Sequence, residues 1–185
     1  MTDQRKQDAK KTRKGRAYLQ DFHKTESGGY RYEGAVYRAA CSAGELRESV
    51  TRQILIAGAA FALSLIAGCF PPAVMGSRLY ILLPFAAELF FTFSLLYRSI
   101  RIRIHGADGS LRSYIYMQTC EKFPLHAGLL TAFAGVTAGA DLVWLILSKG
   151  QLSLLLLVWL ILQAGVILLS IRFKAACANI TWREE

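Results

Sequence analysis

The sequence predicts an all-α membrane protein, an antiparallel bundle of four transmembrane helices. Hydrophobic residues make up 54% of the 185 residues and the mean hydropathy is +0.32, yet the formal net charge is +9. These values are compatible only if charged and apolar residues are segregated along the chain. A helix needs about 20 apolar residues to cross a hydrocarbon core of about 30 Å, and four windows meet that requirement.

The four apolar windows define the predicted helices. Each holds about 18 to 23 residues, which is the length expected of a transmembrane helix. Buried helices of soluble proteins rarely run so far without a polar face. The windows are 53–70, 79–98, 125–147 and 152–171.

Basic residues predict the orientation. All but two of the 22 Lys and Arg lie before the first window, in or at the edge of the loop after the second, or after the fourth. The exceptions, Arg78 and Lys149, lie in two short turns. Because Lys and Arg stay on the cytoplasmic side, we expect a multi-pass protein of the cytoplasmic membrane with the N-terminus, the C-terminus and the middle loop inside.

The chain divides into four predicted parts. Residues 1–26 form a basic tail, 27–52 a Tyr- and Gly-rich segment ending in a pre-membrane helix, 53–172 the membrane domain, and 173–185 a second cytoplasmic tail. The first apolar run begins too late for a cleavable signal peptide, so we expect the first helix to act as its own insertion signal.

The basic tail is a candidate surface for anionic lipid headgroups, since each basic residue near such a surface contributes about 1 kcal/mol. The alternative is a solvated tail that only fixes topology. We expect no nucleic-acid partner, because no aromatic platform accompanies the charge. The candidate headgroup contacts are Arg5, Lys6, Lys10, Lys11, Arg13, Lys14 and Arg16.

Residues 27–40 alternate aromatic and charged side chains around Glu33 and Gly34, a pattern typical of two short strands in a β-ribbon. A two-stranded ribbon is marginal alone, so it should pack on the middle loop, on headgroups or on a partner. Ser42 and Glu45 then form a predicted capping box that starts a helix running into the membrane.

The middle loop, 98–124, has two interpretations. Strict alternation over 100–105 and an apolar run at 114–117 would form two strands around a glycine turn. Alternatively, the second helix extends to about Ile104 and 111–122 form an interfacial helix. We favour the helical interpretation.

Three polar residues interrupt the windows and form a predicted polar layer. At 1.5 Å per residue, Glu88 lies about 14 Å, Asp141 about 9 Å and Gln163 about 16 Å from the outer ends of their helices. Thr92 shares a helix face with Glu88, and Thr137 shares one with Asp141. Intramembrane acids usually face protein or water. This layer is the candidate intramembrane polar or ion site.

The polar layer has three interpretations. Glu88 could hydrogen-bond Gln163, or a backbone carbonyl that Pro84 leaves without its partner, as a structural clasp between helices. With Asp141 it could form a proton- or cation-linked transport site. The layer could also hold a membrane partner, or a lipophilic or cationic ligand.

Motifs of enzymes are absent from the sequence. It contains no nucleophile elbow, P-loop or zinc-protease motif, and its cysteines lack metal-ligand spacing. We therefore expect no enzymatic activity, no cofactor and no metal.

The run from Gly29 to Tyr37 (Gly-Tyr-x-Tyr-x-Gly-x-x-Tyr), followed by four membrane helices with a basic inner loop, resembles small uncharacterised four-helix membrane proteins of Gram-positive bacteria. The resemblance implies the architecture and no activity. We expect an accessory, assembly or interaction partner that associates with a second copy or with another membrane protein. The alternative is a small proton- or cation-coupled transporter using Glu88 and Asp141.

Overall fold

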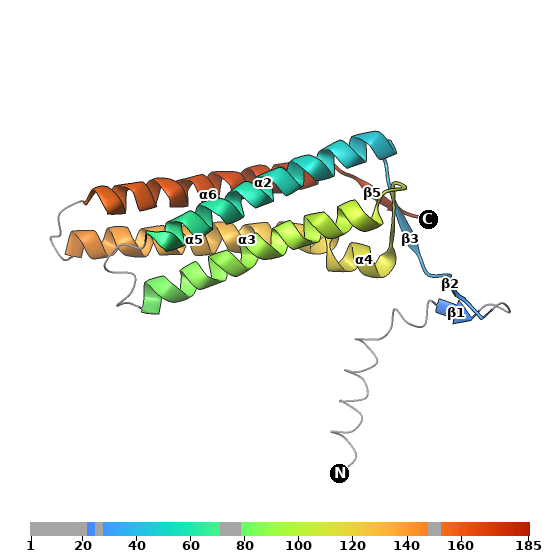
Figure 1. Ribbon diagram of the computed structural model, residues 1–185, viewed down its shortest axis with the longest axis horizontal. Coiled ribbons are helices and arrows are strands. Elements are labelled where there is room, and N and C mark those ends of the chain that lie inside the picture. Colours follow the sequence, from blue (N-terminus) through green and yellow to red (C-terminus); the bar gives the residue numbers. More distant parts are fainter. Residues whose placement is uncertain (1–21, 25–27, 71–78, 148–152) are drawn as a thin grey trace, which may run out of the picture.

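The computed structural model describes residues 22–24, 28–70, 79–147 and 153–185, and four long helices dominate it. Each is long and apolar enough to cross a membrane, so the prediction of four helices able to span a membrane is confirmed for the part of the chain that the structure describes. The helices lie side by side along the long axis of the molecule (Figure 1). They are α2 (Ala43–Cys69), α3 (Leu79–His105), α5 (Phe123–Leu147) and α6 (Leu154–Ala178).

Short elements gather at one end of these helices, which we call the sheet end (Figure 1). They come from the N-terminal region, the middle loop and the C-terminus. They are β1 (Phe22–Lys24), β2 (Tyr30–Tyr32), β3 (Val36–Ala39), β4 (Ser110–Arg112), α4 (Ser113–Gln118), a 3₁₀ helix (Cys120–Lys122) and β5 (Trp182–Glu184).

The helices pack in a ring. Both α2 and α5 pack against α3 and α6, so that α2 lies diagonally opposite α5. The predicted capping box is confirmed: Ser42 Oγ accepts the Glu45 N–H at 3.3 Å, and the Glu45 carboxylate accepts the Ser42 N–H at 2.9 Å. With 27 residues, α2 and α3 are each about 40 Å long, about 10 Å more than a bilayer core requires.

A three-stranded antiparallel sheet closes the sheet end, with β3 between β4 and β5. Tyr37 of β3 lies opposite Leu111 of β4 and Glu184 of β5. The sheet therefore joins three segments that are far apart in the sequence and brings the C-terminus beside β3 (Figure 1). Within residues 173–185, predicted to form the second cytoplasmic tail, α6 continues to Ala178 and β5 follows at Trp182–Glu184.

The predicted ribbon around Glu33 and Gly34 is partly wrong. Strands β2 and β3 do flank these residues, but β2 pairs with β1 and β3 pairs with β4 and β5. The β1–β2 ribbon starts inside the segment expected to be a basic tail. It packs on the middle loop, one of the three expected supports, where Arg112 lies 5.7 Å from the centre of the Phe22 ring and 5.3 Å from that of Tyr32.

The middle loop follows the helical interpretation for most of its length. Helix α3 continues to His105, and α4 and the 3₁₀ helix occupy much of 111–122. Between them, Gly109 adopts a φ of 76° and donates its N–H to Gly106 O at 3.1 Å. This left-handed conformation favours glycine. The turn places β4 against β3, a pairing that alternation alone did not predict.

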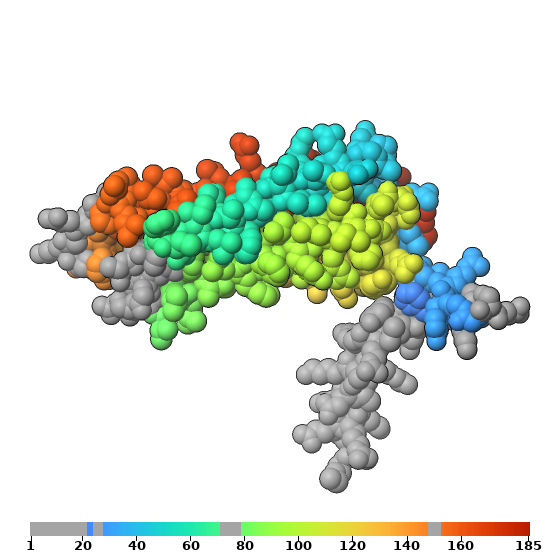
Figure 2. Space-filling view, viewed as in Figure 1, coloured from blue at the N-terminus to red at the C-terminus, as the bar shows by residue number. Residues whose placement is uncertain are grey.

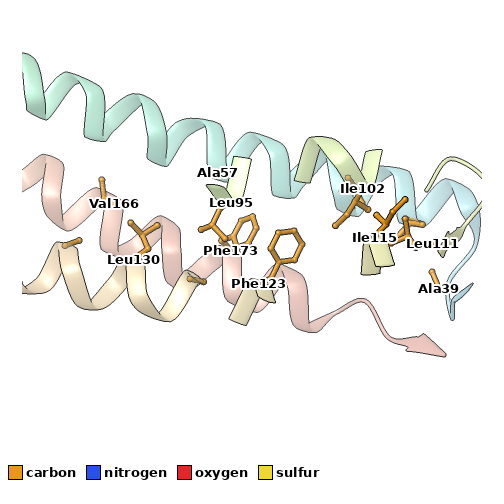
Figure 3. Packing of buried hydrophobic residues seen from close by; sticks show 14 residues of the cluster. Ala39, Ala57, Leu95, Ile102, Leu111, Ile115, Phe123, Leu130, Val166 and Phe173 are labelled. Atoms are coloured by element: carbon orange, nitrogen blue, oxygen red, sulfur yellow. The ribbon is translucent and has the colours of Figure 1, made fainter. Parts of the chain in front are cut away.

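Two hydrophobic clusters fill the bundle. The larger one extends from Val166 to the sheet end, where Leu111 and Ile115 lie near Ala39 (Figure 3). The smaller one lies at the far end of the helices and includes Phe85 and Trp159. The outline of the molecule is a rod with the β1–β2 ribbon projecting at the sheet end (Figure 2).

Candidate functional site

Each long helix buries a stripe of residues spaced alternately by three and four. In α2 the stripe includes Ala57, Ala60, Ser64 and Ala67, and the other three helices repeat the spacing. This spacing is that of helices packed side by side in a left-handed bundle, with the stripe facing the partners. Every residue of the predicted polar layer lies on it. The buried polar residues of the four stripes are Gln53, Ser64, Glu88, Thr92, Ser99, Thr137, Asp141, Gln163 and Ser170.

The polar layer interrupts the apolar core between the two clusters. On α3, Glu88 follows Phe85 of the small cluster and precedes Leu95 of the large one. On α6, Gln163 lies between Trp159 and Val166 in the same way.

Glu88 is completely buried and is clasped by a residue of the neighbouring helix. The Ser64 hydroxyl of α2 donates a hydrogen bond to Glu88 Oε1 at 2.6 Å. The other carboxyl oxygen, Oε2, makes no hydrogen bond with a described residue. A buried carboxyl with one oxygen unpartnered is costly to keep, by about 1 to 3 kcal/mol for an unsatisfied polar group.

Gln163 lies beside the Glu88 carboxyl. Neither the Nε2 nor the Oε1 atom of this amide, however, reaches hydrogen-bonding geometry with any described residue. The two side chains are therefore neighbours without a well-formed hydrogen bond. The structure thus brings Glu88 and Gln163 together, with Ser64 as the partner that holds the acid.

Asp141 is 1% exposed and lies on the buried stripe of α5. Both of its carboxyl oxygens lack a hydrogen-bond partner among the residues that the structure describes. The same is true of the indole Nε1 of Trp159, a fully buried residue of α6. No described hydrogen bond joins Asp141 to Glu88 or to Gln163.

The two predicted threonines bond to their own helices. The Thr92 hydroxyl donates to the carbonyl oxygens of Glu88 and Leu89, at 3.1 and 3.0 Å. The Thr137 hydroxyl donates to Phe133 O at 2.7 Å. Both residues are buried beside the carboxyls, but neither hydroxyl donates to one.

Ser64, Trp159 and Gln53 were missed from the sequence as members of the buried polar set. The signal was present, because a polar residue on the three–four stripe of an apolar helix must face the other helices. In α2, the polar residues on that stripe are Gln53 and Ser64. The candidate headgroup contacts of the N-terminal tail, from Arg5 to Arg16, lie outside the described residues.

At the sheet end, polar and aromatic side chains contact one another through ring stacking, a hydrogen bond and an ion pair. The Tyr37 ring stacks on Tyr116 with 4.0 Å between centroids, and its hydroxyl donates to Glu184 Oε2 at 3.1 Å. That hydrogen bond to a carboxylate raises the pKa of Tyr37 above its usual range. Arg38 and Glu185 form an ion pair at 3.1 Å between β3 and the C-terminal residue.

Four helices of the described residues are long and apolar enough to span a bilayer, which indicates a multi-pass membrane protein. Comparison with family models, with curated proteins and with solved structures found no match. Among the described residues, no three His, Cys, Asp or Glu side chains gather in a way that could hold a metal ion.

Proposed function

We propose that this chain is a protein of the cytoplasmic membrane that works as an accessory or assembly partner, and not as an enzyme. Its sheet end and both termini face the cytoplasm. Three segments rich in Lys and Arg meet at that end, and the positive-inside rule places such segments inside. The resemblance to four-helix proteins of Gram-positive bacteria is in keeping with this role.

One observation carries the proposal: a groove of about 660 Å³ between the β1–β2 ribbon, the last turn of α3 and β4. Its lining includes Tyr30, Arg31, His105 and Arg112. Tyr30 is 74% exposed although it lies on a strand. Tyr and Arg are the residue types that most often dominate binding energy at protein interfaces. A protein segment, from another membrane protein or from a second copy, is the partner that fits such a groove.

Site-specific photo-crosslinking in cells tests this proposal. A photoreactive phenylalanine analogue at Tyr30 should give a discrete adduct with another protein or with a second copy. The same analogue at Met117, which is 49% exposed at the same end but does not line the groove, is the matched control. Equal labelling from both positions, or no protein adduct from Tyr30, would contradict the proposal.

A second candidate function is proton- or cation-coupled transport through the polar layer. It is favoured by the unpartnered carboxyl oxygens of Glu88 and Asp141, since buried acids inside membrane proteins commonly mark ion pathways. Both residues are inaccessible to solvent in this conformation, so the pathway would have to open during a transport cycle.

Reconstitution into liposomes tests the second candidate. The protein should move protons or cations, and Glu88→Gln should abolish the flux. Thr92→Val is the control, because its hydroxyl bonds only to its own helix. Flux that survives Glu88→Gln would remove Glu88 from the mechanism.

A further inference from the structure

A basic cleft lies beside the sheet end, between α3 and the segment formed by α4 and the 3₁₀ helix. It has a volume of about 330 Å³. Three of its lining residues are cationic and none is acidic. The lining consists of Ser94, Tyr97, Arg98, Arg101, Gln118 and Lys122.

The two arginines of the cleft are held by neutral partners. Arg98 Nε donates to Ser94 Oγ at 3.1 Å, and Arg101 Nη1 donates to Gln118 Oε1 at 2.9 Å. The ion pairs between described residues join other groups, so none of them neutralises Arg98, Arg101 or Lys122. The guanidinium groups are therefore oriented while their positive charge stays uncompensated.

His126 adds a neutral partner for Arg98. Its Nδ1 lies 2.8 Å from the Lys122 carbonyl oxygen and must carry a proton to bond there. In the neutral ring, Nε2 is then an acceptor, and it lies 3.4 Å from Arg98 Nη2. The histidine thus fixes the guanidinium without cancelling its charge.

The cleft lies where the apolar surface ends. Arg98 is the last residue of the predicted membrane window 79–98, and Lys122 lies just before the window 125–147. The neighbouring outward-facing side chains are apolar or amphipathic: Phe93 is 53% exposed, Tyr97 52% and Leu125 61%. A ligand here meets positive charge on one side and hydrocarbon-compatible surface on the other.

We propose that this cleft binds the phosphate ester of an anionic membrane lipid. Arg98, Arg101 and Lys122 hold the phosphate, and the acyl chains lie along the exposed apolar faces of α3 and α5. The planar fork of arginine matches phosphate oxygens in pairs, and basic pockets between membrane helices bind anionic headgroups. This inference depends on the membrane placement of the helices and not on the protein partner proposed above.

Native mass spectrometry of the intact protein in mild detergent tests the site. With phosphatidylglycerol and phosphatidylcholine at equal concentration, the wild type should retain one phosphatidylglycerol with at least about tenfold preference. The double variant Arg101→Gln, Lys122→Gln should lose that preference. The matched control Arg172→Gln, Arg183→Gln removes two exposed charges elsewhere at the same end and should keep it.

Further arms of the experiment separate the sources of phosphate and the effects of folding. Millimolar inorganic phosphate should leave the lipid bound; its displacement of the lipid would overturn the lipid assignment in favour of a soluble phosphate. Arg101→Lys keeps the positive charge but removes the planar guanidinium group. It should therefore weaken the retention of phosphatidylglycerol by less than the double variant does. Equal retention of both lipids by the wild type, or equal loss in both double variants, would overturn the proposal.

Discussion

The sheet end and the polar layer differ in how their polar side chains are partnered. At the sheet end, Tyr37 donates to Glu184 and Arg38 pairs with Glu185, so that charged and hydroxyl groups have partners. In and around the polar layer, several buried polar atoms have no hydrogen-bond partner among the described residues. Six of the seven buried side-chain atoms without a described hydrogen bond belong to Glu88, Asp141, Trp159 and Gln163.

The contrast indicates which part of the molecule stabilises the fold. An unpartnered buried polar group costs about 1 to 3 kcal/mol, whereas well-packed apolar side chains stabilise the fold. The larger hydrophobic cluster and the sheet lie together at one end, and the polar layer separates them from the small far cluster. We infer that the sheet end carries most of the free energy of unfolding, and that the polar layer subtracts from it.

The largest expected effect comes from the core near the sheet end. Phe173 is 1% exposed and packs edge-to-face on Phe123 with 5.2 Å between centroids. Phe173→Ala should lower the free energy of unfolding by about 3 to 5 kcal/mol, through lost burial and a cavity. Unfolding in mixed micelles with increasing SDS measures it. Phe90→Ala, at a residue 62% exposed, is the control and should cost far less.

The contact between α2 and α6 beside the polar layer should give a smaller effect. A Cβ added at Gly165 would meet Leu63 Cδ1 at 3.0 Å, whereas one added at Gly135 would meet nothing within 4 Å. Gly165→Leu should therefore cost about 1 to 3 kcal/mol by overpacking. Gly135→Leu should leave the same SDS unfolding curve nearly unchanged. If both variants unfold alike, the helix arrangement described above is incorrect.

Within the polar layer, the hydrogen bond from Ser64 to Glu88 can be removed by a single substitution. Ser64→Ala leaves the Glu88 carboxyl without its donor and should cost about 1 to 2 kcal/mol. The comparison is Thr92→Val, which removes a hydroxyl bonded to its own helix and should cost less than Ser64→Ala. A larger loss for Thr92→Val would show that Ser64 is not the partner that matters.

The smallest effect concerns pH at the sheet end. The Tyr37–Glu184 bond needs the protonated phenol, and it raises the pKa of Tyr37. Its contribution is therefore complete below the ordinary tyrosine pKa of about 10 and is lost as the pH rises through the raised value. Glu184→Gln should lower the pKa of Tyr37, measured by ¹³Cζ tyrosine NMR against Glu121→Gln. An unchanged titration would mean that the bond does not persist in solution.

Much of the helical part could be predicted from the sequence because its signals are local. The length of the four apolar windows predicted the four helices, and the Ser42–Glu45 capping box predicted the start of α2. Hydropathy, however, predicts only which residues cross the membrane, and not where the helix ends. Helix α6 therefore runs past Arg172 and Lys174 to Ala178, since charged residues suit a helix that has left the bilayer.

The sheet could not be predicted, because its pairing is non-local. Strands β4 and β5 have three residues each, and both pair with β3 from distant parts of the chain. A three-residue strand has too little alternation to be recognised. In the polar layer, Glu88, Asp141 and Gln163 were conspicuous as polar residues in apolar windows. Ser64 is less conspicuous, because it lies among the small residues of α2 and only the three–four spacing of the buried positions identifies it.

One measurement tests most directly whether the polar layer lowers the stability of the fold. The triple variant Ser64→Ala, Glu88→Leu, Gln163→Leu replaces the clasp and its unpartnered neighbour with apolar groups. Because replacing both partners of a buried polar contact can be neutral or stabilising, its free energy of unfolding in SDS mixed micelles should equal or exceed that of the wild type. A loss of more than about 2 kcal/mol would contradict the account and identify the polar layer as a stabilising clasp.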